Sequence, residues 1–301
     1  MAEIPMPGED ANVLPETQRL SAAYQSWYRF SRNPTAVIGA GIVILCLLAA
    51  VLAPLITPYP DHVGAVVDFR NRHQPPSWEH WMGTDNVGRD ILTRVIYGMR
   101  MSLLLAFVVL GVAVPVGTLL GLAAGYFGGW VEVVIMRLTD VALAIPALVL
   151  LMTVATVLSP SLITTMLALA ALWWTWHARL VYGITQQLRH QEFVEAAEIL
   201  GASKLHILVR EILPNCVSAL AVKTSLDCGF VILTGAALSF LGLGAQPPAP
   251  DLGTMVAAGT TYLPDFWWAS ILPGVAVLFV ALGFNLLGDG LRDLFDVQEI
   301  R

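Results

Sequence analysis

The sequence predicts an all-α membrane protein with six transmembrane helices. Of its 301 residues, 56% are hydrophobic and only 13% are charged, which leaves too few polar side chains to cover a soluble globule of this length. A bilayer crossing needs about 20 largely apolar residues. Six runs reach that length, namely residues 36–57, 102–125, 132–158, 161–182, 215–240 and 267–288.

Charge, cysteine content and the lack of catalytic motifs argue against several other classes of protein. The formal net charge of −6 argues against a nucleic-acid partner, which would need a basic face. Cys46, Cys216 and Cys228 all lie within predicted spans without the spacing of metal ligands, so we interpret them as packing residues. No nucleophile or acid–base motif of a known catalytic kind is present. We therefore predict no metal, no bound cofactor and no catalytic residue in this chain.

Residues 1–35 predict a cytoplasmic tail that carries an amphipathic helix. One helical face collects apolar and aromatic side chains and has basic residues nearby: Leu20, Ala23, Tyr24, Trp27 and Tyr28, with Arg19, Arg29 and Arg32. Such a helix suits the anionic inner leaflet ahead of the first span, 36–57. Six spans place both termini in the cytoplasm, with a second tail at 291–301.

The predicted outer loop, residues 58–101, contains the glycine-rich segment Gly83-Thr-Asp-Asn-Val-Gly-Arg-Asp90. Its two glycines are reminiscent of a phosphate loop, but it lacks the Lys-Ser/Thr pair that holds phosphate and magnesium. Its oxygen ligands also do not alternate as they do in a calcium loop. We interpret the segment as a turn capped by Asp85 that leads into a helix.

The membrane core, residues 102–290, contains two sets of residues that need an explanation. Gly117, Gly121 and Gly125 form a double small-xxx-small pattern, which lets another helix approach closely, within this chain more readily than in a partner. Lys223 and Asp227 stand at i, i+4 in the fifth span, where charge is costly. They either neutralise each other against a neighbouring helix or line a substrate path, and both interpretations stay open.

Two further groups in the core have simpler interpretations. Arg137 and Asp140 are expected to pair with each other, while His177 and its neighbouring tryptophans are expected to form an interfacial belt.

A charged segment between the fourth and fifth spans, residues 183–213, predicts a helix–turn–helix elbow. Its apolar positions recur at i, i+3, i+4 and i+7, as on one face of a helix: Phe193, Ala196, Ala197 and Leu200. Gly201 can end this helix in a left-handed conformation, and Ser203 can cap a second short one. A hydrophobic protein that keeps such a charged helix at a membrane face uses it to meet a partner.

These motifs resemble the permease subunits of bacterial ABC importers. Glu195-Ala196-Ala197, Gly201 and Leu213-Pro214 are similar to the family's EAA loop, although Glu211 stands where the family has isoleucine. Residues 83–103 resemble the second permease of the dipeptide/oligopeptide branch almost position by position. The segments 238–255 and 284–293 also resemble that branch, with Leu252 in place of the expected tryptophan.

The resemblance implies a type I-like permease fold in the bacterial cytoplasmic (inner) membrane. It implies a heterodimer with a homologous permease, two subunits that bind ATP and Mg, and an external binding protein that delivers peptides. The coupling residues would be those on the elbow, Phe193, Glu195, Ala196, Ala197, Leu200 and Gly201. Nickel complexes, glutathione or opines are alternative cargoes. A secondary transporter is less favoured, because no inverted repeat is visible.

Overall fold

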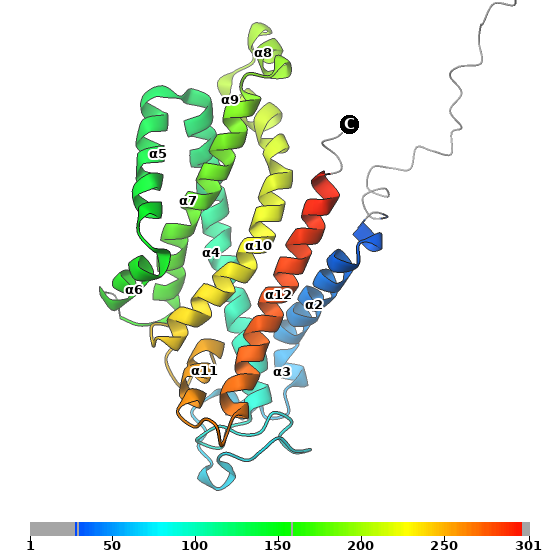
Figure 1. Cartoon of the computed structure of the whole chain (residues 1–301), viewed down its shortest axis with the longest axis vertical. Coiled ribbons are helices and arrows are strands. Elements are labelled where there is room, and N and C mark those ends of the chain that lie inside the picture. The colour runs from blue at the N-terminus through cyan, green and yellow to red at the C-terminus, as the bar shows by residue number, and fades with distance from the viewer. Residues whose placement is uncertain (1–27, 29, 158, 297–301) are drawn as a thin grey trace, which may run out of the picture.

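The computed structural model describes Tyr28, residues 30–157 and residues 159–296 (Figure 1). Within them the only β-type pairing is an isolated bridge between Thr84 and Asp90. The helices are α2 (Pro34–Val51), α3 (Ala53–Ile56), η2 (Pro60–Val63), η3 (Phe69–Asn71), α4 (Ile91–Phe127), α5 (Gly129–Ala144), α6 (Ala147–Val157), α7 (Leu162–Leu188), α8 (Glu192–Ile199), α9 (Lys204–His206), η4 (Ile207–Ile212), α10 (Leu213–Phe240), α11 (Leu252–Thr260) and α12 (Trp268–Asp296). Most of the predicted N-terminal amphipathic helix lies outside the described residues.

Helix α12 runs antiparallel between α2 and α10, and glycines set the close approach. On the α2 side, Gly290 lies against Ala36 and Gly283 against Ile42. On the α10 side, Gly288 lies against Leu226, and the Ser225 hydroxyl donates to the Phe284 carbonyl at 3.2 Å. The start of α2 and the end of α12 therefore lie at the same end of the molecule.

Helix α4 is the longest of the described helices, and its C-terminal half pairs with α7. Its 37 residues correspond to about 55 Å. A Cβ on Gly117 or Gly121 would come within 2.5 Å of a carbonyl oxygen of α7, from Trp174 and Ala178 respectively. The three glycines of the sequence pattern thus face α7 of the same chain.

One predicted helix is interrupted. The run 132–158 is not one helix, because α5 and α6 meet at a 90° bend. Pro146 lies at this break, where it cannot continue the α5 hydrogen bonds. Helix α4 begins at Ile91, within the predicted loop 58–101, as expected for the helix that follows the Asp85 turn. Helix α12 continues to Asp296, into the predicted tail at 291–301.

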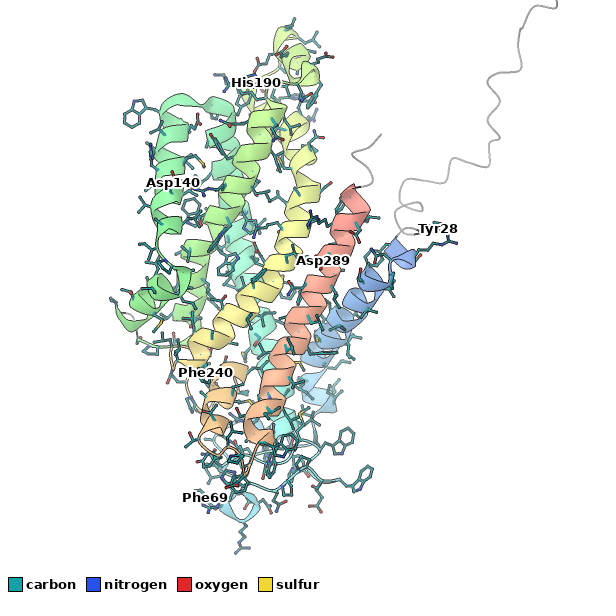
Figure 2. The ribbon with its side chains drawn as sticks, viewed as in Figure 1. Tyr28, Phe69, Asp140, His190, Phe240 and Asp289 are labelled. Carbon is teal, nitrogen blue, oxygen red and sulfur yellow. The ribbon has the colours of Figure 1, made fainter. Side chains whose placement is uncertain are left out.

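Four described helices are long and apolar enough to cross a membrane, and the bent pair α5–α6 could add a fifth. Helix α7, the fourth predicted span, is not among them, and the count of six crossings stays a prediction. Helices α8 and α9 project at one end of the bundle, while α11 and the loop between α3 and α4 lie at the other (Figure 1). His190 and Phe69 mark these opposite ends in Figure 2.

Candidate functional site

The elbow, α8 to η4 (residues 192–212), has the turn chemistry that its sequence predicts. Gly201 has a φ of +81°, which favours glycine, and its N–H donates to the Glu198 carbonyl at 3.0 Å. The Ala202 N–H donates to the Ala197 carbonyl at 3.0 Å. This pair of bonds is a Schellman motif that ends α8. Ser203 then caps α9 by accepting from the His206 N–H.

One side of the elbow is fixed to the bundle. Val194 is fully buried and joins an apolar cluster with Leu122, Tyr126 and Val181. The Tyr126 hydroxyl, at the C-terminal end of α4, donates to Glu198 Oε1 at 2.9 Å. Val194 and Glu198 are one turn apart, so apolar packing and a hydrogen bond hold the same face of α8.

The other side of the elbow exposes apolar side chains. Ile199 and Leu200 are both 86% exposed, and Leu205 on α9 is 71% exposed. Phe193 and Ala196 are exposed as well. The predicted apolar face is therefore present but uncovered in the isolated chain, except that Ala197 is partly buried against the bundle.

The last part of the elbow, which leads into α10, is a π-helix, η4, from Ile207 to Ile212. π-Helical turns are rare and often occur at functional sites. Ile207 and Ile212 are buried in the cluster that holds Val194, while Pro214 follows in the first turn of α10. Because the sequence pattern is that of an ordinary helix, the π-helix could not be predicted from it.

Lys223 and Asp227 form the predicted pair and acquire a third member. Lys223 Nζ lies 2.5 Å from Asp227 Oδ1, and His177 Nε2 lies 3.5 Å from Asp227 Oδ2. Asp227 is only 2% exposed, whereas the Lys223 side chain is 31% exposed and lines a cavity of about 420 Å³ between α10 and α12. His177 is fully buried, so its predicted place in an interfacial belt is wrong.

The expected pairing of Arg137 with Asp140 is only part of a larger cluster. Asp140 accepts a short hydrogen bond from Arg179 of α7, whereas Arg137 Nη1 lies 4.0 Å from the same carboxylate. The ion pair thus ties α5 to α7. The i, i+3 spacing predicted Arg137 as the partner of Asp140. It could not reveal Arg179, the stronger partner, which lies on another helix.

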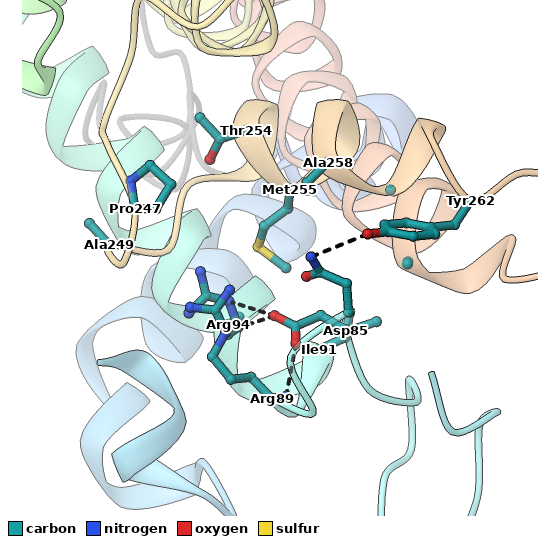
Figure 3. Close-up of a pocket in the computed structure, with 13 residues that line it drawn as sticks. Asp85, Arg89, Ile91, Arg94, Pro247, Ala249, Thr254, Met255, Ala258 and Tyr262 are labelled. Atoms are coloured by element: carbon teal, nitrogen blue, oxygen red, sulfur yellow. Dashed lines mark hydrogen bonds and ion pairs between the residues drawn. The ribbon is translucent and has the colours of Figure 1, made fainter. Parts of the chain in front are cut away.

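The glycine-rich segment forms a junction at the end of the bundle opposite the elbow, and Figure 3 shows it close up. The Asp85 carboxylate accepts from the Val87 and Arg89 N–H groups and pairs with the Arg89 side chain at 2.8 Å, so Asp85 caps this turn as predicted. Asp90 is the N-cap of α4 and accepts from the Thr93 N–H at 2.8 Å. Since the guanidinium of Arg89 is held by Asp85, the segment has the features of a structural turn.

Arg94 connects this junction to the chain that follows α10. Its Nη1 and Nη2 both donate to the Pro248 carbonyl at 3.3 Å, and Nη1 also donates to the His62 carbonyl at 3.1 Å. Three residues further, Asp251 caps α11, and burial is the main cause that raises the pKa of its carboxyl group. A small pocket of about 70 Å³ lies between this segment and the Asp85 turn.

Two family models match the chain. One, described as the binding-protein-dependent transport system inner membrane component, matches residues 117–298. The chain belongs to this family. The other, described as the N-terminal TM domain of oligopeptide transport permease C, matches residues 21–76. The resemblance inferred from the motifs is confirmed.

Relatives of this permease match almost its whole length. It is 42% identical to the probable D,D-dipeptide transport system permease protein DdpC of Escherichia coli strain K12, over 96% of each chain. It is 39% identical to the dipeptide transport system permease protein DppC of Alkalihalophilus pseudofirmus, over 97% of this chain and 95% of that one. It is also 38% identical to the glutathione transport system permease protein GsiD of Pectobacterium atrosepticum, over 90% and 89% of the two chains.

The fold of the permease has a solved counterpart. A chain of the methionine ABC transporter MetNI, in an inward-facing conformation, superposes with a TM-score of 0.52 at 17% identity, over 68% of this chain and 95% of that one. The predicted type I-like permease fold is therefore confirmed.

Proposed function

We propose that this permease forms half of the membrane channel of an ATP-driven peptide importer and that its elbow docks on an ATP-binding subunit. The observation that carries the proposal is the exposed apolar face of α8 and α9, at one end of the helical bundle. Burying a fully exposed leucine or isoleucine is worth about 1.5–3 kcal/mol. Ile199 and Leu200 together therefore favour a covered state, and the Schellman turn presents them in a fixed geometry.

The names of the relatives indicate the class of cargo. DdpC and DppC are named for dipeptides, so we infer that a peptide is delivered by an external binding protein. A glutathione permease is related to this chain at similar identity, so a modified peptide or another small solute is the alternative cargo. A homologous permease would complete the channel, and two ATPase subunits would bind ATP and Mg below it. Both termini of this chain would then lie in the cytoplasm with the elbow.

The elbow acts mechanically in this proposal. ATP-driven closure of the ATPase subunits moves the docked elbow, and the helices attached to it pivot as rigid bodies. The gap between the two permeases then switches from inward-open to outward-open. Phe193, Ala196 and Leu200 contribute apolar contact, while Glu195, which is exposed, contributes polar contact at the rim. Catalysis takes place in the ATPase subunits alone.

Replacing Leu200 with glutamate is expected to release the ATPase subunits. A charge placed at the centre of an apolar interface must be buried without a partner, which costs several kcal/mol. The measurement is co-purification of ATPase subunits with the tagged permease in detergent. Leu200→Met, which keeps the apolar contact, should retain them in stoichiometric amount. Retention of stoichiometric ATPases by Leu200→Glu would refute docking at this face.

A second proposal concerns the buried pair. Lys223 and Asp227 would line the substrate path, where a zwitterionic peptide can exchange its termini for their charges. The Lys223 ammonium borders an open cavity, which supports this role. The double variant Lys223→Met with Asp227→Leu should then change the preference of uptake among dipeptides of different net charge. Unchanged uptake and preference would remove the pair from the path.

A further inference from the structure

Helix α4 is bonded through side chains at its two ends to opposite ends of the molecule. It runs without a break from Ile91 to Phe127, over about 55 Å. At one end it contacts the elbow, and at the other it contacts the segment between α10 and α11, residues 241–251. The established family and the proposed docking do not assign a role to either contact.

The inner contact is specific. Tyr126 is 6% exposed, and its hydroxyl reaches Glu198 on α8, a residue 72 positions further along the chain. The Arg189 guanidinium lies over the Tyr126 ring at 6.0 Å. A hydrogen bond to a carboxylate is stronger than a neutral one and is directional. A displacement of α8 is thus passed to the last turn of α4.

The outer contact is likewise made by a buried side chain that hydrogen-bonds to a distant part of the chain. The Arg94 side chain is 4% exposed, and both of its terminal nitrogens donate to the Pro248 carbonyl. Its Nε lies 3.8 Å from Asp85 Oδ2, the same carboxylate oxygen that pairs with Arg89. The first turn of α4 and the segment 241–251 are therefore bonded through one side chain.

The part of α4 between these contacts is stiffened by α7. Gly117, Gly121 and Gly125 bring the two helices into backbone contact. Close-packed helices move together, because packed cores switch between discrete arrangements and do not deform continuously. A shift at Tyr126 would therefore be shared with α7 along residues 117–125 and would pass Pro115 to reach the outer half of α4.

We propose that α4 transmits the movement of the elbow to the outer segment 241–251, with Tyr126 and Arg94 as the positioning residues at its two joints. The proposal rests on the proposed function, because the elbow must be driven by a docked ATPase. In this role neither residue needs to contact cargo or ATP. Their effect is on the outer segment, which borders the side from which cargo arrives.

The test follows the outer segment while the ATPases are trapped in the closed state. Spin labels are placed at Leu241→Cys, at the end of α10, and at Leu55→Cys in α3, both exposed positions. The three natural cysteines are buried. The distance between the labels is measured by pulsed electron spin resonance in the full complex in nanodiscs, without nucleotide and with ATP, Mg²⁺ and vanadate.

Tyr126→Phe, which removes one hydroxyl and keeps the ring, should reduce the vanadate-induced distance change by at least half. Glu198→Ala should do the same, and the two together should do no more than either alone. Glu198→Gln keeps an acceptor oxygen and should retain the full change. Tyr182→Phe is the matched control, because it removes a similar bond that joins α7 to Glu132 of α5 and not to the elbow.

Arg94→Lys, which cannot keep both donors on Pro248, should also reduce the distance change while the ATPases stay bound. A full change in Tyr126→Phe and Arg94→Lys, with ATPases bound in both, would overturn the role of α4 and leave docking intact. Absence of any change in the unsubstituted complex, or loss of the ATPases from it, would instead count against the proposed function.

Discussion

Gly121→Ala is expected to destabilise the permease strongly, since the added methyl group would meet backbone. Its Cβ would lie 2.5 Å from the Ala178 carbonyl oxygen and 2.8 Å from the Val181 Cβ. Neither group can rotate away, so α4 and α7 must separate. Overpacking of a core costs about 1–3 kcal/mol, and backbone contact places this variant at the upper end. The measurement is the midpoint of thermal unfolding in detergent.

Gly111→Ala is the matched control on the same helix. A Cβ at Gly111 meets nothing within 4 Å. The substitution should therefore have the opposite sign, because alanine favours a helix over glycine by about 0.8–1.0 kcal/mol. If both variants shift the midpoint in the same direction and by the same amount, the glycines do not determine the α4–α7 contact.

Local patterns predicted the elbow well. The end of α8 at Gly201, the cap at Ser203 and the position of Pro214 each depend on residues within a few positions of one another. The glycine period of α4 likewise predicted close packing, since helical spacing fixes which residues share a face. The predictions that succeeded are those whose physical cause is short-range.

The predictions that failed required knowledge of the fold. Tyr126 and Glu198 are 72 residues apart, and Asp140 and Arg179 are 39 apart, so neither spacing shows in the sequence. The third run was predicted as one span, whereas the 90° break beside Pro146 also needs room for α6 to turn aside. His177 was placed at an interface because of its tryptophan neighbours, yet its face of α7 is the one that packs on Gly117.

Because His177 is buried beside Asp227, Asp227 has two ionisable neighbours and not one. A carboxylate that is 2% exposed, with an ammonium at 2.5 Å and an imidazole nitrogen at 3.5 Å, belongs to a group of three that must be considered together. Taking such charges out of water is costly, and their mutual attraction offsets much of that cost only while both partners are present. Stability and transport can therefore be separated at this site.

Asp227→Leu alone is expected to lower the free energy of unfolding by about 3 kcal/mol, the lower end for a broken buried pair. It leaves the Lys223 ammonium without its partner, although the partly exposed side chain can still reach the neighbouring cavity. Adding Lys223→Met removes the unpaired ammonium group. The unfolding midpoint should then return to that of the unsubstituted permease or rise above it. The double variant is thus stable enough for the uptake measurement. A double variant as unstable as Asp227→Leu would show that packing around His177, and not charge balance, sets the stability here.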